Sequence, residues 1–150
     1  MTVVLELPVL AAALLVALAP AVGPPTAPPP RVDGTSAEPP PAWVEAGTRS
    51  RWLAYSSFCW TTACVDFIPP QSRPDLPAVS AKVGTTVRFH LRFMPRTATL
   101  ALLGPGGPQQ QWKLVPGRVI EWRVRRGGVL LLSARASAGS AGYAIRLRTG

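Results

Sequence analysis

Two cysteines and one histidine are the residues of this chain best suited to chemistry. Cys59 and Cys64 are separated by four residues, a spacing at which two thiols can face each other across a hairpin. In an exported protein such a pair is expected to be oxidised, so we predict a local disulfide between them. The alternatives are a redox-active pair and a zinc site that includes His90. Both are weaker, because the spacing is not C-x-x-C and a Cys₂His set lacks a fourth ligand.

His90 lies between Arg88 and Arg92, on the polar side of an alternating segment. A catalytic histidine needs a partner, usually a carboxylate, that orients the imidazole ring. Asp75 and Glu121 are the nearest acids in sequence, and no nucleophile motif accompanies them. We therefore expect a surface histidine, no metal or other cofactor, and no enzymatic activity. A small redox or hydrolytic enzyme is the second alternative.

Basic side chains outnumber acidic ones, with 16 Lys and Arg against 7 Asp and Glu and a net charge of +9. Six arginines occupy the polar positions of three alternating segments: Arg88, Arg92, Arg123, Arg125, Arg146 and Arg148. If these segments are neighbours, their guanidinium groups form one face that binds carboxylate or phosphate bidentately. An anionic envelope polymer or lipid headgroups would then be the ligand, and we do not expect nucleic acid, for which no motif is present. In the competing interpretation the arginines lie in different sheets and only keep the surface solvated.

Apolar and polar residues alternate with a period of two through most of the chain after residue 42, which predicts strands. The clearest segments are Val87–Phe93, Ile120–Arg125 and Tyr143–Arg148, and turns are expected at Gly127–Gly128 and Ala138–Ser140. Further candidate strands are Arg51–Trp60, Ala63–Ile68, Pro77–Val83, Thr97–Leu103, Gln110–Val115 and Val129–Ala136. The pattern predicts an all-β fold, a single antiparallel Ig-like β-sandwich of seven to nine strands that spans residues 43–150.

Five tryptophans add a further set of candidate contacts. Trp122 is in phase with the apolar side of its segment, so we expect it in the core, and Trp52 and Trp60 should flank the core. Trp43 follows three prolines and is expected to clamp the preceding segment onto the domain. The phase of Trp112 is ambiguous.

The residues around the cysteines also resemble a known pattern. Tyr55 to Trp60 (YSSFCW) followed by Cys64-Val65-Asp66 is similar to the SYCW…C-x-D signature of small exported bacterial proteins of unknown function. The C-terminal strand from Gly142-Tyr143 onward is similar to their G-x-Y-x-[FI]-x-[LV] strand, although here Gly142 and Tyr143 are adjacent. The resemblance implies a single β-sandwich behind a signal or lipoprotein segment, and it implies no activity.

The N-terminal part of the chain predicts export. Val9–Ala19 is apolar but too short to span a bilayer, and small residues at Ala19 and Ala21 suit a cleavage site, so residues 1–21 are interpreted as a signal peptide or anchor. Glu6 and the lack of a basic residue before the apolar run depart from a standard signal peptide. The alternative is a membrane anchor formed by residues 9–22.

Prolines dominate the next segment, residues 22–42, which we interpret as an extended, solvated linker. Taken together, the sequence predicts a non-enzymatic, exported module of the cell envelope with a structural or protein-binding role. Its expected partner is an envelope protein of unknown identity or an anionic polymer, and a membrane only through the N-terminal segment if that segment is not cleaved.

Overall fold

The computed structural model of this protein describes residues 22–34 and 37–150. The predicted signal peptide or anchor, with its cleavage position after Ala21, lies outside the described residues. Within the described part of the chain, no helix is long and apolar enough to cross a membrane. The only helical element in these residues is the 3₁₀ turn η1 (Pro70–Ser72).

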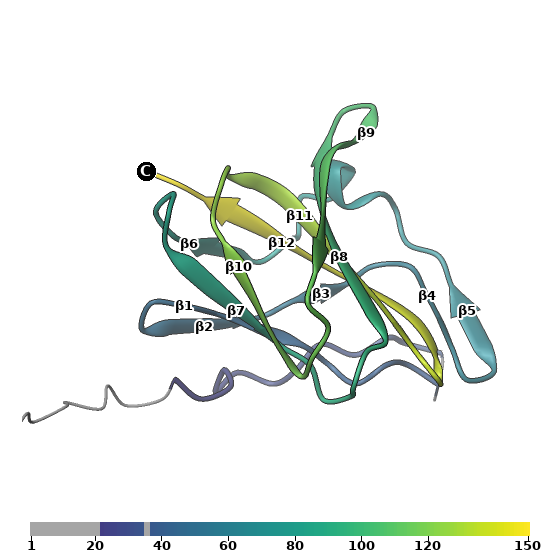
Figure 1. Cartoon of the computed structure of the whole chain (residues 1–150). Coiled ribbons are helices and arrows are strands. Elements are labelled where there is room, and N and C mark those ends of the chain that lie inside the picture. Colours follow the sequence, from purple (N-terminus) through teal and green to yellow (C-terminus); the bar gives the residue numbers. More distant parts are fainter. Residues whose placement is uncertain (1–21, 35–36) are drawn as a thin grey trace, which may run out of the picture.

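The described residues form two packed β-sheets (Figure 1). The smaller sheet has four strands, all antiparallel to their neighbours, in the order β10-β7-β1-β2. Their bounds are β10 (Val119–Arg123), β7 (Thr86–His90), β1 (Trp43–Ala46) and β2 (Arg49–Trp52).

The larger sheet has the long hairpin of β11 and β12 at its centre, and its main order is β5-β4-β12-β11-β8-β9. The bounds are β5 (Ala63–Val65), β4 (Phe58–Trp60), β12 (Gly139–Arg148), β11 (Gly128–Ala136), β8 (Thr97–Gly104) and β9 (Gly107–Leu114). Two short strands also pair with β12: β3 (Ala54–Tyr55) in antiparallel fashion and β6 (Ala78–Ser80) in parallel.

The predicted antiparallel β-sandwich is therefore confirmed, but the described residues hold more strands than the seven to nine expected. The predicted strand Arg51–Trp60 is broken into β2, β3 and β4, because the chain leaves the smaller sheet at the buried Leu53 and continues in the larger one. Strand β1 was not predicted. The turn near Ala138–Ser140 is confirmed as the β11–β12 hairpin, whereas Gly127–Gly128 connects two different sheets and is not a hairpin turn.

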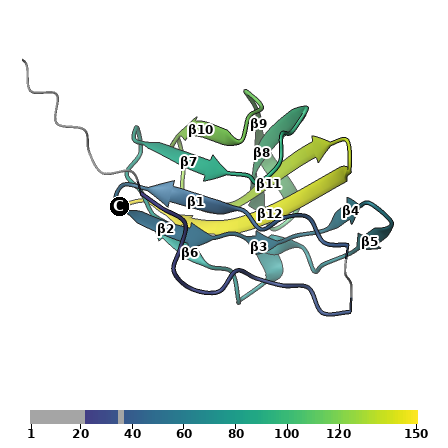
Figure 2. The same ribbon diagram turned by 90° about the horizontal axis from the view of Figure 1, so that it is seen from below.

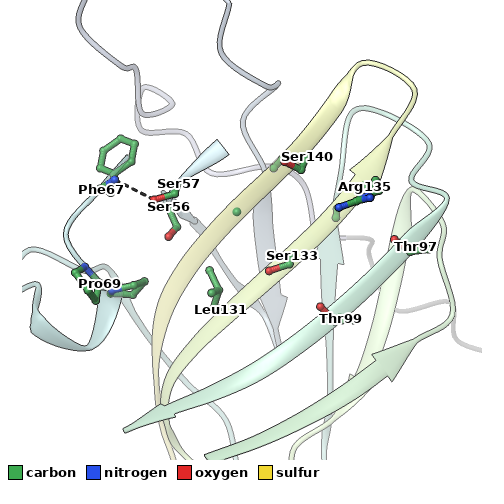
Figure 3. A pocket seen from close by; sticks show the side chains of 14 residues that line it. Ser56, Ser57, Phe67, Pro69, Thr97, Thr99, Leu131, Ser133, Arg135 and Ser140 are labelled. Atoms are coloured by element: carbon green, nitrogen blue, oxygen red, sulfur yellow. Dashed lines mark hydrogen bonds between the residues drawn. The ribbon is translucent and has the colours of Figure 1, made fainter. Parts of the chain in front are cut away.

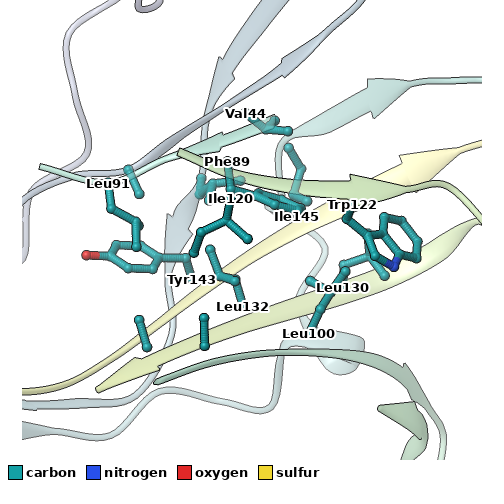
Figure 4. Packing of buried hydrophobic residues seen from close by; sticks show 14 of the residues in the cluster. Val44, Phe89, Leu91, Leu100, Ile120, Trp122, Leu130, Leu132, Tyr143 and Ile145 are labelled. Atoms are coloured by element: carbon teal, nitrogen blue, oxygen red, sulfur yellow. The ribbon is translucent and has the colours of Figure 1, made fainter. Parts of the chain in front are cut away.

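The main hydrophobic core lies between the two sheets and follows the predicted alternation (Figure 4). From the smaller sheet it receives Val44, Val87, Phe89, Ile120 and Trp122, and from the larger sheet Leu100, Leu130, Leu132, Tyr143 and Ile145. These side chains alternate with residues that point out of the core, because successive side chains of a strand face opposite sides of its sheet. The arginines of β7 and β10 are exposed for this reason.

The proline-rich segment is anchored to the sandwich at its C-terminal end, whereas most of residues 23–31 are exposed. Pro39 is fully buried. The hydroxyl of Tyr55 donates a hydrogen bond to the Pro39 carbonyl at 2.5 Å, and that of Tyr143 donates to the Pro40 carbonyl at 2.7 Å. Figure 2 shows the segment passing across β1 and β2 before it enters the fold.

Candidate functional site

The six arginines of the predicted anion-binding face do not share one sheet. Arg88 and Arg123 belong to the smaller sheet, with Arg92 and Arg125 just beyond its strands, whereas Arg146 and Arg148 belong to β12 of the larger sheet. The condition for one shared face of six guanidinium groups, that all three strands are neighbours, is therefore not met, as in the competing interpretation. The periodicity showed correctly that the side chains leave the core, but it could not show which strands are neighbours.

The segments that carry four of the six arginines nevertheless lie at one end of the sandwich, where Arg123 and Arg125 leave the core on the side of the smaller sheet and Arg146 and Arg148 on the side of the larger sheet. The loop between β6 and β7 bridges the two sheets there: the amide of Ala81 donates to the carbonyl of Arg148 at 3.0 Å, and that of Val124 donates to Thr85 at 2.8 Å. On the other side, Gly128 pairs with Leu147. Figure 1 shows the β6–β7 loop, the β10–β11 connection and the end of β12 near the C-terminus, and each of these segments carries basic residues.

We call this region the basic end. Its members are Lys82, Arg123, Arg125, Arg126, Arg146 and Arg148. Among the described residues, none of the six forms an ion pair with a carboxylate. One hydrogen bond orients the side chain of Arg123 toward the β6–β7 loop, because its Nε donates to the carbonyl of Gly84 at 3.1 Å. All six are exposed except Arg146, which is half-buried.

Two members of the basic end were missed by the sequence analysis. Lys82 lies just before the turn at Gly84, and Arg126 lies directly before the glycines that connect β10 to β11. Neither residue is part of an alternating strand, so the periodicity gave no reason to select it. The adjacent pair Arg125-Arg126 in front of two glycines was the one available signal of a basic loop.

The other two predicted arginines are engaged elsewhere. The guanidinium of Arg88 lies between two acids, with Nε 3.0 Å from a Glu121 oxygen and Nη1 3.4 Å from a Glu45 oxygen. Arg88 is therefore neutralised locally, and these hydrogen bonds, chiefly that to Glu121, raise its pKa. Arg92 lies past the opposite end of β7, where its guanidinium carbon is 5.6 Å from the ring centre of Trp52.

His90 is half-buried, although a surface histidine was expected. Its ring stacks on Trp43, with ring centres 3.7 Å apart and ring planes 2° apart. Its Nε2 atom is buried and has no hydrogen-bond partner among the described residues. Burial lowers the pKa of His90 below 6.5, Arg88 acts in the same direction, and Glu45 opposes both.

The cysteines form the predicted disulfide, with their Cα atoms 4.0 Å apart. Cys59 and Cys64 face each other directly across the β4–β5 hairpin, and both are exposed. The amide of Thr61 at the hairpin tip donates to the carbonyl of Ala138 at 2.7 Å, which attaches the hairpin to the β11–β12 turn. Among the described residues, no group of three or more His, Cys, Asp or Glu could hold a metal ion.

The five tryptophans divide between the core that lies between the two sheets and the outer face of the smaller sheet. Trp122 and Trp60 are buried as predicted, and Trp112 packs against Trp122 with ring centres 5.2 Å apart. Trp52 bonds to the proline-rich segment, because its indole Nε1 donates to the carbonyl of Ala27 at 2.7 Å. Trp43 lies within β1, is buried and stacks on His90, and its role as a clamp of this segment stays a prediction.

A groove of about 670 Å³ lies on the outer face of the larger sheet (Figure 3). Its floor is polar where β8, β11 and β12 run side by side, because Thr97 pairs with Arg135 and Thr99 pairs with Ser133 in the strand register. Its opposite wall includes Phe67. The hydroxyls of Thr97, Thr99 and Ser133 bond to no other described residue, which leaves them open to solvent.

The same outer face becomes apolar further along the strands. A small second cluster gathers there: Leu76, Ala101, Leu103, Val129 and Ala144. Leu76 reaches it from the chain that follows η1, and η1 itself contacts β8 and β11. The polar groove is thus the part of this face that the chain leaves uncovered, and no carboxylate lines it.

Comparisons with known proteins gave no match: no family model, curated protein or solved structure is similar to this chain.

Proposed function

We propose that this protein is a non-enzymatic, exported β-sandwich module that binds an anionic polymer of the cell envelope through its basic end. One observation carries the proposal: the β6–β7 loop, the end of β10 with the connection to β11, and the end of β12 place six basic residues at one end of the sandwich, and none has a carboxylate partner in the described chain. Like charges gathered without compensation repel each other, and an external anion relieves that repulsion. Five of the six are arginines, whose planar guanidinium group binds phosphate or carboxylate bidentately.

Several features support a binding module rather than an enzyme. The two thiols are joined in a disulfide, and the ring of His90 is stacked on Trp43 with its Nε2 atom buried. A general base must reach the proton that it abstracts, and this nitrogen does not reach solvent. The exposed disulfide also supports export, because such bonds persist mainly in oxidising compartments.

Chromatography on phosphocellulose and carboxymethyl matrices across a salt gradient tests the proposal. The fourfold variant R123Q/R125Q/R146Q/R148Q should elute at clearly lower salt than the parent protein. It has fewer guanidinium groups that attract the matrix, so less salt is needed to screen that attraction. The matched control is R31Q/R96Q/R118Q/R135Q, which removes the same charge from exposed arginines outside the basic end. The control should shift much less.

Two results would contradict the proposal. Equal shifts of the two fourfold variants would mean that only total charge matters, which leaves a structural or protein-binding module. Binding to anionic lipid vesicles, but not to soluble polyphosphate or polyglutamate, would assign the basic end to lipid headgroups instead.

Arg88→Gln should leave retention almost unchanged, because Glu45 and Glu121 already neutralise this side chain.

A further inference from the structure

A row of aromatic side chains crosses the outer face of the smaller sheet. Trp52 pairs with Trp43 across β2 and β1, and Trp43 pairs with His90 across β1 and β7. The rings of Trp43 and His90 are stacked, and the guanidinium of Arg92 lies over the ring of Trp52. We call these four residues the aromatic row. The three rings lie next to one another in the register of three adjacent strands, and Trp43 in the middle of the row is buried.

The proline-rich segment of the same chain lies on this surface. The carbonyl of Ala27 accepts a hydrogen bond from Nε1 of Trp52 at 2.7 Å. Ala27 is flanked by Pro24-Pro25 on one side and by Pro28–Pro30 on the other. A proline-rich segment favours an extended conformation, and its carbonyls stay free to accept hydrogen bonds because the prolines offer no competing N–H groups. Aromatic surfaces that bind proline-rich peptides exploit this preformed, extended conformation.

The two halves of the segment are held in different ways. Near the first strand, Pro39 is fully buried and two buried tyrosine hydroxyls bind the carbonyls of Pro39 and Pro40, so this half is part of the fold. In the half that contains Ala27, the side chains of residues 23–31 are exposed or half-buried. Trp52 makes the one side-chain hydrogen bond to residues 22–31 in the described structure. This outer half can therefore leave the surface without opening the core.

We propose that the aromatic row is a binding site for a proline-rich, extended peptide of another protein, and that residues 22–31 occupy it as an intramolecular competitor. This role goes beyond the binding of an anionic polymer, and it uses no residue of the basic end. The competitor is tethered to its site, so its effective concentration is on the order of millimolar. A partner peptide binds well only when its concentration and affinity outweigh those of the tethered segment, or when that segment has left the aromatic row.

Fluorescence anisotropy with a labelled peptide of residues 22–30 (VGPPTAPPP) tests this proposal on the full chain. With an acetylated N-terminus and an amidated C-terminus this peptide carries no charge, so its binding does not report on the basic end. In the variant P28G/P29G/P30G the internal segment loses its preference for the extended conformation. This variant should bind the labelled peptide about tenfold more tightly than the parent protein does.

A second substitution locates the site. In the P28G/P29G/P30G background, Trp52→Phe keeps an aromatic ring but removes the indole donor, and it should weaken peptide binding about fivefold. Trp112→Phe is the matched control, because Trp112 packs against Trp122 at the core between the sheets and not on the outer face of the smaller sheet, and it should leave the affinity unchanged. A peptide in which glycine replaces every proline should not bind.

Three results would overturn the proposal. The first is no saturable binding of VGPPTAPPP to P28G/P29G/P30G when circular dichroism shows that variant to be folded. The second is the same affinity for the Trp52→Phe and Trp112→Phe variants. The third is a concentration-dependent dimer of the parent protein that the free peptide dissociates, since this would assign the aromatic row to the segment of a second copy.

Discussion

Trp43 and His90 stack face to face across β1 and β7, with ring centres 3.7 Å apart and ring planes 2° apart. The contact buries the imidazole next to an indole and leaves its Nε2 atom without a partner in the described structure. A charged imidazolium would be poorly solvated at this position, so the neutral form is favoured. The only histidine of the chain thus contributes packing to the outer face of the smaller sheet.

The stacked histidine predicts a pH dependence of stability. The pKa of His90 is lowered by burial in the folded state, so the unfolded chain binds more protons at this site below pH 6.5. Stability should therefore fall as the pH drops from 6.5 toward the lowered pKa, and above 6.5 the site contributes no pH dependence. Urea unfolding of the parent protein and of His90→Phe, at about pH 7.5 and 5.5, measures this effect. The midpoint should fall less in the variant, and equal falls would contradict the prediction.

The two tyrosines should stay protonated in strongly alkaline solution. They are the only tyrosines of the chain, both hydroxyls are donors to proline carbonyls, and burial raises both pKa values above the ordinary 10.0. Absorbance of phenolate at 295 nm should therefore appear only with alkaline unfolding. Because the unfolded chain loses these protons first, stability should decrease as the pH rises above 10.0. A smooth phenolate titration near pH 10 in folded protein would exclude the two hydrogen bonds.

Removal of the Tyr143 hydroxyl should weaken the attachment of Pro40. Tyr143→Phe keeps the buried ring but leaves the proline carbonyl without its donor, which should cost about 1–2 kcal/mol of unfolding free energy. Denaturant unfolding with an unchanged m-value would measure this loss. A variant as stable as the parent protein would show that water replaces the hydroxyl at no cost.

The disulfide should contribute modestly to stability. It closes a loop across one hairpin, with a sequence separation of 5, and the loop-entropy estimate for so short a ring is about 2 kcal/mol. Cys59→Ala with Cys64→Ala should lower the unfolding free energy by no more than this and should leave the circular dichroism spectrum unchanged. Mass spectrometry of a non-reduced digest should show the two linked peptides. Loss of the folded spectrum would mean that the bond organises more than its own hairpin.

Gly139 should not tolerate a side chain. Its φ angle is +145°, and a Cβ atom at this position would overlap the carbonyl oxygen of Cys59 on the neighbouring strand β4. Gly139→Ala should therefore destabilise the fold by more than about 1 kcal/mol. Gly106 is the matched control, because a Cβ atom there meets nothing within 4 Å. Unfolding of both variants at the same denaturant concentration would contradict the close approach of Gly139 in β12 to Cys59 in β4.

Local pattern was enough to predict much of this protein. The alternation in Val87–Phe89 and Ile120–Trp122 placed the apolar side chains in the core and the arginines outside, because successive side chains of a strand point to opposite faces of its sheet. The pairing of Cys59 with Cys64 followed from their short separation, which leaves few geometries other than a hairpin. Both inferences depend on residues that are close together in the chain.

The tertiary structure decided which strands are neighbours, and with that the composition of each surface. A period of two assigns a side chain to a face but does not say which strand lies beside it, since that choice depends on how the two sheets pack over a shared core. Arg148 meets the loop of Lys82 only because β6 pairs with β12, and Arg88 is neutralised only because β7 lies between Glu45 of β1 and Glu121 of β10. Likewise, no local pattern showed that Pro39 would be buried, because the tyrosine that binds its carbonyl lies 16 residues further along the chain.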